Sequence, residues 1–382
     1  MTDRSINPHR FRRRAALAGG LLACGLVAAA CGSSGSGSST GKVASGATTA
    51  TTTASGGLAS SGSSGSGSSG SGSGSSGSSG SGSGGANVSG VTLSIGDQAG
   101  TGAQALLQAA GLIDKLPFKV KWHDFTSGPP ILQAMNAGSV DVGGVGNAPP
   151  IFAAAGGAKI DIVGAVKADN ASGALLVPAH SPIHSVSQLK GQKIAVEEGT
   201  SGDAHLLNVL NQAGISVKDV TIDNLQPADG LAAFSSGSVN AWDVWSPYIE
   251  EAVQKDHARV LVNWKPYGGE YSFVVASKAA LASPAKAAAI KDYVKILNQA
   301  YRWSDTHTAT WAKLWGTATG LSIGIMDQAA KDTVEVPVPI TAKVVGSQQD
   351  LINEFAKAGL IPKAYSFSQY SYSGFNSLFG KS

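Results

Sequence analysis

From residue 91 onward, short runs of β-branched and aromatic residues alternate with longer amphipathic segments. The strand-like runs of the first series are residues 91–95, 119–122, 140–142 and 160–163, and the helix-like segments between them are residues 104–113 and 130–137. Pro130 suits the first turn of a helix, where its missing N–H breaks no hydrogen bond. Strand, helix and strand in succession predict right-handed crossovers and a mainly parallel sheet.

A second series of the same kind follows Gly191. Its strand-like runs are residues 193–196, 220–222 and 241–245, with a helix over 203–213, and a further strand is expected at 271–276 before Ala-rich helices. The Pro-rich segment at 178–182 separates the two series and indicates a crossing. We therefore predict an α/β protein of two lobes with a cleft between them, in which lobe 1 comprises 89–180, lobe 2 comprises 181–270, and 271–382 returns to lobe 1.

The first 31 residues have the pattern of an export signal. Five Arg precede the small and apolar run 15–30, which is shorter than a bilayer-spanning helix requires. We interpret residues 1–30 as a lipoprotein signal peptide and Cys31, which ends the apolar run, as the site of lipid attachment; Cys24 is the rival. The Arg12–Arg13 pair leaves twin-arginine export open beside the general route.

Residues 31–88 are almost wholly Gly, Ser, Thr and Ala. A segment with so few large apolar groups has nothing with which to form a core, so we predict a disordered tether. As a Gly-rich coil it spans on the order of 40 Å, enough to hold a domain away from a membrane surface.

Charge and side-chain chemistry exclude several functions. The net charge is +3, but the first fourteen residues alone contribute +4, so the remainder has no basic surface for nucleic acid. Both cysteines precede the predicted lobes, and His180, His184, His205, His257 and His307 lack metal-ligand spacing. We expect no metal, no cofactor and no catalytic residue.

Polar residues follow several of the predicted strands, where ligands of α/β sheets collect. Helix N-termini at these positions offer N–H donors and a partial positive charge to an anion. In lobe 1 we select Ser127 and Gly128, and Asn147 and Ala148. The alternative role of Ser127 is an ordinary N-cap, and that of Asn147 is a turn residue.

In lobe 2 the corresponding strand end carries Thr200 and Ser201, for which helix capping is the alternative. Trp242 and Trp245 are three apart on one strand and face opposite sides, so one belongs to the core and Trp245 offers an apolar wall to a ligand. Gln98, after the first strand, is a further donor candidate or an exposed turn residue.

The densest motifs lie at residues 127–141 and 145–152, followed by 185–196, 226–229 and 241–248. In these segments the chain resembles the periplasmic solute-binding proteins of the aliphatic sulfonate, taurine and nitrate group, and most of all the alkanesulfonate-binding branch. The loop 199–205 is longer than the usual Gly-Ser-Ser-containing loop, and Ser246 stands where an acidic residue is common. Both departures fall where ligand specificity is set.

The resemblance implies a type II two-lobed binding protein that captures an aliphatic sulfonate or a similar small anion. It also implies ABC permease subunits as partners, with the lipid anchor on the outer face of the cytoplasmic membrane, and we expect a monomer. Two alternatives stay open: a binding protein for nitrate, bicarbonate or a neutral pyrimidine-like solute, and an enzyme on the same fold.

Overall fold

The computed structural model describes residues 87–98, 102–168, 172–265 and 269–379. The predicted signal peptide, Cys31 and all but the last two residues of the predicted tether lie outside this range. Within the described residues, no helix has both the length and the apolar character needed to cross a bilayer.

Lobe 1 is built on a six-stranded sheet with the order β11-β4-β10-β3-β1-β2. Its strands are β1 (Thr92–Gln98), β2 (Lys119–Phe125), β3 (Val142–Val145), β4 (Ile160–Ala168), β10 (Tyr271–Ser277) and β11 (Glu335–Val338). β1 pairs in parallel with β2 and β3, whereas β10 runs antiparallel to β3 and β4. A strand from the C-terminal third of the chain thus lies between two strands from the N-terminal part.

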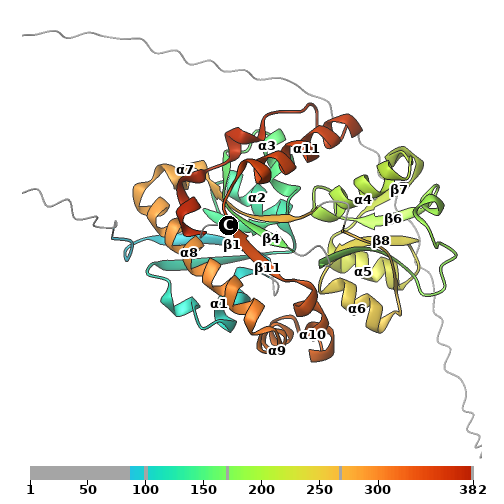
Figure 1. Ribbon diagram of the computed structural model, residues 1–382, viewed down its shortest axis with the longest axis horizontal. Coiled ribbons are helices and arrows are strands. Elements are labelled where there is room, and N and C mark those ends of the chain that lie inside the picture. The colour runs from blue at the N-terminus through green and yellow to red at the C-terminus, as the bar shows by residue number, and fades with distance from the viewer. Residues whose placement is uncertain (1–86, 99–101, 169–171, 266–268, 380–382) are drawn as a thin grey trace, which may run out of the picture. The chain divides into compact units, whose positions relative to one another are not determined.

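Helices cover both faces of this sheet (Figure 1). The helices of one face are α1 (Ala103–Ala109), α7 (Lys278–Ala282), α8 (Pro284–Thr306), α9 (Thr308–Thr319) and α10 (Ile323–Asp332), and those of the other are α2 (Gly128–Asn136), α3 (Pro149–Ala155) and α11 (Ala342–Ala358). Each set encloses its own apolar core against the sheet. The sheet side chains alternate between the two cores, as Leu93 and Val145 do.

Lobe 2 has a five-stranded sheet with the order β7-β6-β8-β5-β9. Its strands are β5 (Gly173–Val177), β6 (Lys193–Val196), β7 (Thr221–Asn224), β8 (Ala241–Trp245) and β9 (Arg259–Asn263). Helix α4 (Ser201–Gln212) packs on one face, and α5 (Pro227–Ser235) and α6 (Tyr248–Lys255) pack on the other. Short 3-10 turns at Ile113–Lys115, Val186–Leu189, Val217–Asp219, Phe367–Tyr370 and Ser373–Leu378 complete the described elements.

The sheets depart from a fully parallel arrangement at a few strands. Most strands of each sheet run in one direction, but β10 and β11 in lobe 1 and β5 in lobe 2 pair antiparallel with their neighbours. The first crossing comes before Gly173 rather than at the Pro-rich segment 178–182, since β5 already belongs to the lobe 2 sheet. The second crossing lies between β9 and β10.

Candidate functional site

The two lobes contact each other through hydrogen bonds at their strand ends. Ser127, at the N-cap of α2, donates from Oγ to Oε1 of Glu197 in lobe 2 over 2.6 Å, and both residues are buried. The Asn147 N–H donates to Ser201 Oγ over 3.1 Å. The chain segments after β2 and β3 of lobe 1 are therefore held to the segment after β6 of lobe 2.

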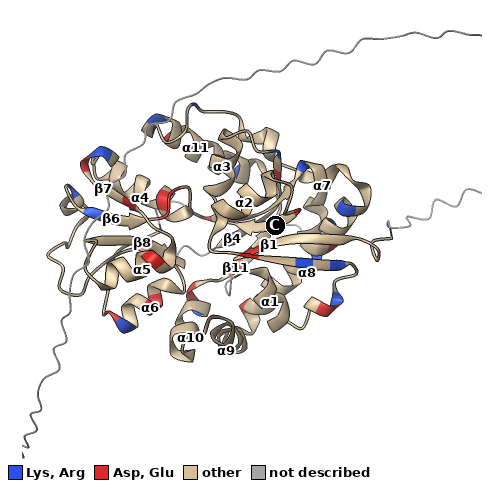
Figure 2. Ribbon diagram, turned by 180° about the vertical axis from the view of Figure 1, so that it is seen from behind, with Lys and Arg blue, Asp and Glu red and all other residues tan. Residues whose placement is uncertain are grey.

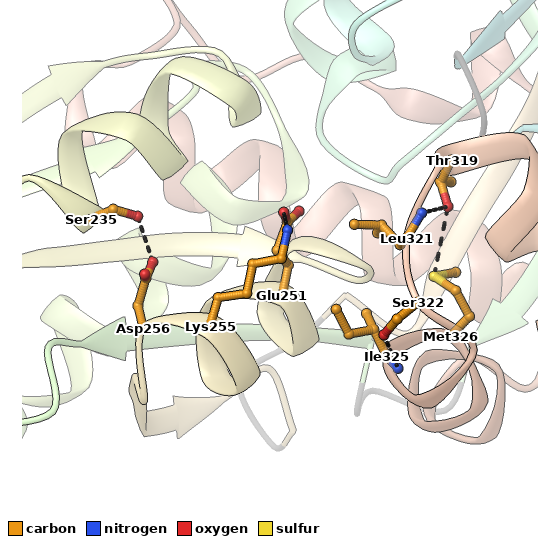
Figure 3. A network of polar contacts seen from close by, with 9 residues as sticks. All are labelled: Ser235, Glu251, Lys255, Asp256, Thr319, Leu321, Ser322, Ile325 and Met326. Carbon is orange, nitrogen blue, oxygen red and sulfur yellow. Dashed lines mark hydrogen bonds and ion pairs between the residues drawn. The ribbon is translucent and has the colours of Figure 1, made fainter.

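A second contact between the lobes involves helix α6 of lobe 2 and helix α10 of lobe 1. Figure 3 shows the Lys255–Glu251 ion pair of α6 on one side, and Thr319 with Met326 at the turn from α9 to α10 on the other. Glu250, one residue from that pair, is buried, and burial raises the pKa of its carboxyl, with a smaller contribution from Asp332 of lobe 1. Acidic groups of the two lobes thus face each other here.

A cavity lies between these contacts and draws its walls from both lobes. It is bordered by the ends of β1, β3, β4 and β8, by the N-termini of α1, α2 and α4, and by parts of α8, α9, β10 and β11. Among the described residues that line it, none is Lys, Arg or His. Figure 2 shows that lysine and arginine positions lie instead on outer elements such as α7, β7 and the end of α6.

The lobe 1 wall near α2 is made of glycine backbone. Gly128, Gly144 and Gly146 all line the cavity. A Cβ at Gly146 would overlap the Ser201 hydroxyl of lobe 2, and one at Gly128 would lie 2.8 Å from Pro149. Glycine at these positions permits the lobe 1 backbone to come close to the cavity and to lobe 2.

The lobe 2 wall opposite is the N-terminus of α4. Thr200 is its N-cap, 3% exposed, with its Oγ1 donating to the Glu197 carbonyl over 2.6 Å. The first N–H groups of a helix have no acceptor within the helix, so those of Ser201 and Gly202 carry the partial positive charge of the α4 dipole. α2 in lobe 1 and α4 in lobe 2 both begin at this cavity.

Aromatic residues form much of the remaining wall. Trp245 and Trp264 come from lobe 2, and Trp311 and Trp315 come from α9 of lobe 1, where their rings stack with centroids 5.0 Å apart. Trp242, on the other face of β8, is buried against Phe234, as strand alternation predicts. The cavity thus joins a polar end made of backbone N–H groups with apolar walls suited to an organic tail.

One carboxyl that lines the cavity, Asp97, is held by the backbone. Its oxygens accept from the N–H groups of Ala103 at 2.6 Å and Gln104 at 3.2 Å, so it caps α1 from the end of β1. Burial raises the pKa of Asp97 to about 6, although these two hydrogen bonds act in the opposite direction. The N-terminus of α1 is therefore occupied by the protein's own carboxyl.

The second carboxyl, Glu335, begins β11 and lies near Asp305 and Tyr301 of α8. Burial, with a smaller contribution from the charge of Asp305, raises the pKa of Glu335 to about 7. Near neutral pH a large fraction of this carboxyl is thus protonated, which reduces the negative charge facing a bound anion.

The structure brings together most of the residues selected from the sequence. Gln98, Gly128, Thr200, Ser201 and Trp245 all line the cavity. The Gln98 amide also donates to the Gly144 carbonyl over 3.4 Å.

The other three selected residues lie just behind the wall. Ser127 is fully buried and bonded to Glu197, and Ala148 is fully buried at the N-cap of α3. Asn147 is 6% exposed, its carbonyl accepts from Gln348 of α11, and its Oδ1 has no hydrogen-bond partner among the described residues.

Sequence reasoning did not select the residues supplied by the C-terminal part of the chain. These are Trp264, Tyr271, Tyr301, Trp311, Trp315 and Glu335. The clustering of three tryptophans at 303, 311 and 315 was a usable signal, because helical spacing places 311 and 315 on one face. The sequence did not indicate which side chains of α8, α9 and β11 would reach the cavity.

Two α/β lobes, crossed twice by the chain and enclosing a cavity at their strand ends, define the class of two-lobed solute-binding proteins. Within that class, the family model described as NMT1/THI5 like matches residues 126–307. A protein of Escherichia coli strain K12 named for binding aliphatic sulfonates is 32% identical over 283 residues, which cover 72% of this chain and 87% of that protein. The chain belongs to the family of these aliphatic sulfonate-binding proteins.

Two further relatives agree with this placement. A protein of Bacillus subtilis strain 168, also named for binding aliphatic sulfonates, is 31% identical over 62% of this chain and 71% of its own length. The structure of the alkanesulfonate-binding protein of Xanthomonas axonopodis pv. citri bound to MOPS superposes with a TM-score of 0.71, at 30% identity, over 74% of this chain and 99% of that one.

Proposed function

We propose that the protein captures an aliphatic sulfonate outside the cytoplasm and delivers it to the permease of an ABC importer. The observation that carries this proposal is the cavity in which α2 of one lobe and α4 of the other both begin, with no basic side chain among its described lining residues. A sulfonate placed there accepts from backbone N–H groups and gains from two helix dipoles.

The walls of the cavity support an organic tail on this anion. A free inorganic anion would leave the surfaces of Trp245, Trp264 and Trp311 in contact with water, whereas an alkyl chain covers them. The relatives named for aliphatic sulfonates, and the relative solved with MOPS, are consistent with such a ligand. On this proposal the contacts are made by Gly128, Gly146, Thr200, Ser201 and the aromatic walls, with Gln98 at the rim, while Ser127, Asn147 and Ala148 support them from behind.

Titration calorimetry of the purified full chain tests the ligand. We expect binding of butanesulfonate, octanesulfonate and MOPS, and much weaker binding of sulfate and nitrate, because these leave the aromatic walls uncovered. Binding of nitrate or of a neutral pyrimidine with no binding of any sulfonate would overturn the proposal. Mass spectrometry of each mixture tests the alternative that the protein is an enzyme. A binding protein leaves every solute chemically unchanged, whereas an enzyme forms a product.

We propose further that the chain is exported and anchored by lipid on Cys31, and that it acts as a monomer. The apolar run ending at Cys31 and the periplasmic location of related binding proteins support this. Labelling of cells with a radioactive fatty acid should mark the wild type and Cys24→Ser, but not Cys31→Ser. Equal labelling of both variants would remove the anchor from the proposal, and sedimentation of the purified chain reports its oligomeric state.

A further inference from the structure

A buried hydrogen-bond network in lobe 2 connects the core of the lobe to the cavity wall. Asp243 lies on the central strand β8, and its Oδ1 accepts from the Trp264 indole N–H over 2.9 Å. Its Oδ2 lies 2.5 Å from Nδ1 of His205 on α4, whose Nε2 lies 3.2 Å from the carbonyl of Asn263. Asp243 and His205 are 1% and 2% exposed.

His205 connects the Asp243 carboxyl group to the end of β9. One ring nitrogen of His205 lies next to the Asp243 carboxyl group and the other lies next to the Asn263 carbonyl. The Trp264 ring lies beside the imidazole, with its centroid 6.0 Å from that of His205. The carboxyl group, the imidazole and the indole thus form one buried network.

Contacts with Gly173 also fix the position of Trp264. A Cβ at Gly173, at the start of β5, would overlap the indole ring of Trp264. The backbone N–H of Trp264 donates to the Gly173 carbonyl over 3.0 Å. The ring is 6% exposed, and it lines the cavity. Trp264 is therefore held at two points. Its backbone N–H is bound by Gly173, and its indole Nε1–H is bound by Asp243.

We propose that Asp243, which also contacts His205, is the positioning residue that sets Trp264 as the wall of the cavity and so determines which sulfonate tails the protein accepts. Asp243 touches no ligand and acts through the indole. The same network joins α4, β8 and the end of β9, which supply Ser201, Trp245 and Trp264 to the cavity. The part of this inference that concerns ligand choice rests on the proposed sulfonate-binding function.

A double-mutant cycle tests the coupling of Asp243 to Trp264. Affinities for butanesulfonate and octanesulfonate are measured by calorimetry on the full chain for wild type, Asp243→Leu, Trp264→Phe and the double variant. We expect Asp243→Leu and Trp264→Phe each to change the ratio of the two affinities at least fivefold, and the double variant to behave like Trp264→Phe alone. Additive changes would show that Asp243 does not act through Trp264 and would overturn the proposal.

Asp243→Asn and Arg259→Met serve as the conservative variant and the matched control. Asn keeps every contact, with Oδ1 accepting from Trp264 and Nδ2 donating to a neutral His205, so we expect an affinity ratio within twofold of wild type. Arg259 binds the carbonyls of Ala179, Ser181 and Ile183 within lobe 2 and does not line the cavity. Its variant should lose stability with an unchanged ratio, and a changed ratio there would assign the effect to general loosening of the lobe.

A spectroscopic readout keeps the test independent of any ligand. In a ¹H–¹⁵N spectrum of the labelled chain, the indole resonance absent from Trp264→Phe belongs to Trp264. We expect it at low field, as for an N–H donated to a carboxylate, and moved upfield in Asp243→Leu if that variant folds and in Asp243→Asn in any case. An unmoved resonance in Asp243→Asn would overturn the positioning role. Failure of the wild type to bind any sulfonate, with this shift intact, would instead remove only the proposed function.

Discussion

The two halves of the cavity are built by different means. The lobe 1 half near α2 consists of glycine backbone, so its donors stand in place without any side chain to hold them. The lobe 2 half consists of hydroxyl and indole groups, and its Trp264 is held by the buried side chain of Asp243, which also contacts His205. Substitutions that add side-chain atoms should therefore weaken binding most in the lobe 1 half. In the lobe 2 half, binding should be weakened by substitutions that remove side-chain atoms or the residues that hold them.

The largest effect is expected from adding atoms to lobe 1. Gly146→Val places a branched side chain where the Ser201 hydroxyl of lobe 2 now lies, so the lobes cannot approach. We expect at least about a hundredfold loss of sulfonate affinity, about 2.7 kcal/mol, by calorimetry. The melting temperature should change little, because the overlap is with the other lobe. Gly346→Ala on α11, which has open space around it, is the control and should bind as wild type.

The next largest effect is the pH dependence of stability caused by Glu335, an ionisable side chain in the lobe 1 half. Its pKa of about 7 in the folded protein exceeds the unfolded value of 4.5, so the folded state binds more protons between these values. Its contribution to stability is full below pH 4.5 and is lost as the pH rises through 7, on the order of 2 kcal/mol.

Urea denaturation at pH 5 and pH 8 measures this contribution. The free energy of unfolding should fall between the two pH values in wild type and fall less in Glu335→Gln, which keeps the shape and removes the titration. Equal pH dependence in both proteins would mean that Glu335 titrates normally in the fold. Burial also raises the pKa values of Asp97 and Asp203 to about 6, and these two residues contribute equally to the pH dependence of stability in both proteins.

A smaller effect is expected at the contact between the halves. Ser127→Ala removes the hydrogen bond to Glu197 and leaves that buried carboxyl without its donor. We expect about tenfold weaker binding, about 1.4 kcal/mol, since closing of the lobes then buries an unsatisfied group. Glu197→Gln should restore part of the affinity in the Ser127→Ala background, because an amide is less costly to bury than a carboxylate. Unchanged binding in Ser127→Ala would show that the contact does not contribute to closing.

The smallest effect is expected when lobe 2 loses one hydroxyl. Ser201→Ala removes the acceptor of the Asn147 N–H, at a half-buried position. We expect about 0.5 to 1 kcal/mol of lost binding free energy, a change of about two- to fivefold in the dissociation constant. Ser235→Ala, which breaks an exposed hydrogen bond to Asp256 far from the cavity wall, is the matched control. If Ser201→Ala lost more binding free energy than Ser127→Ala, the expected order of these two contacts would be wrong.

The local part of the fold was predictable from the sequence because it depends on near neighbours. Strands β6 and β8 were predicted with the bounds that the structure shows, and α2 begins at Gly128, two residues before the expected Pro130. The position of β10 between β3 and β4 was not predictable, since it joins residues more than a hundred positions apart and no periodicity encodes that pairing. The short strand β5 was missed because a fully buried strand shows little alternation. β9, whose residues are partly exposed, was missed as well.

The same distinction applies to the site. Thr200, Ser201 and Gly128 follow strands, and the rule that ligands collect at strand ends was sufficient to select them. Trp264 and Glu335 line the cavity through long-range packing, and Asp243 acts from within a strand where the sequence suggested no clear acidic role. His205 looked like one of several scattered histidines, and only the fold shows that its two nitrogens meet a carboxylate and a carbonyl.

The insertion of β10 between β3 and β4 also sets an order of assembly during synthesis. Lobe 2 is complete once Asn263 has been made, but β4 gains its neighbours only when β10 and then β11 follow. A chain that emerges from its N-terminus therefore carries an unfinished first lobe until almost its whole length is available. The pairing of strands far apart in the sequence thus postpones completion of lobe 1 until synthesis is nearly finished.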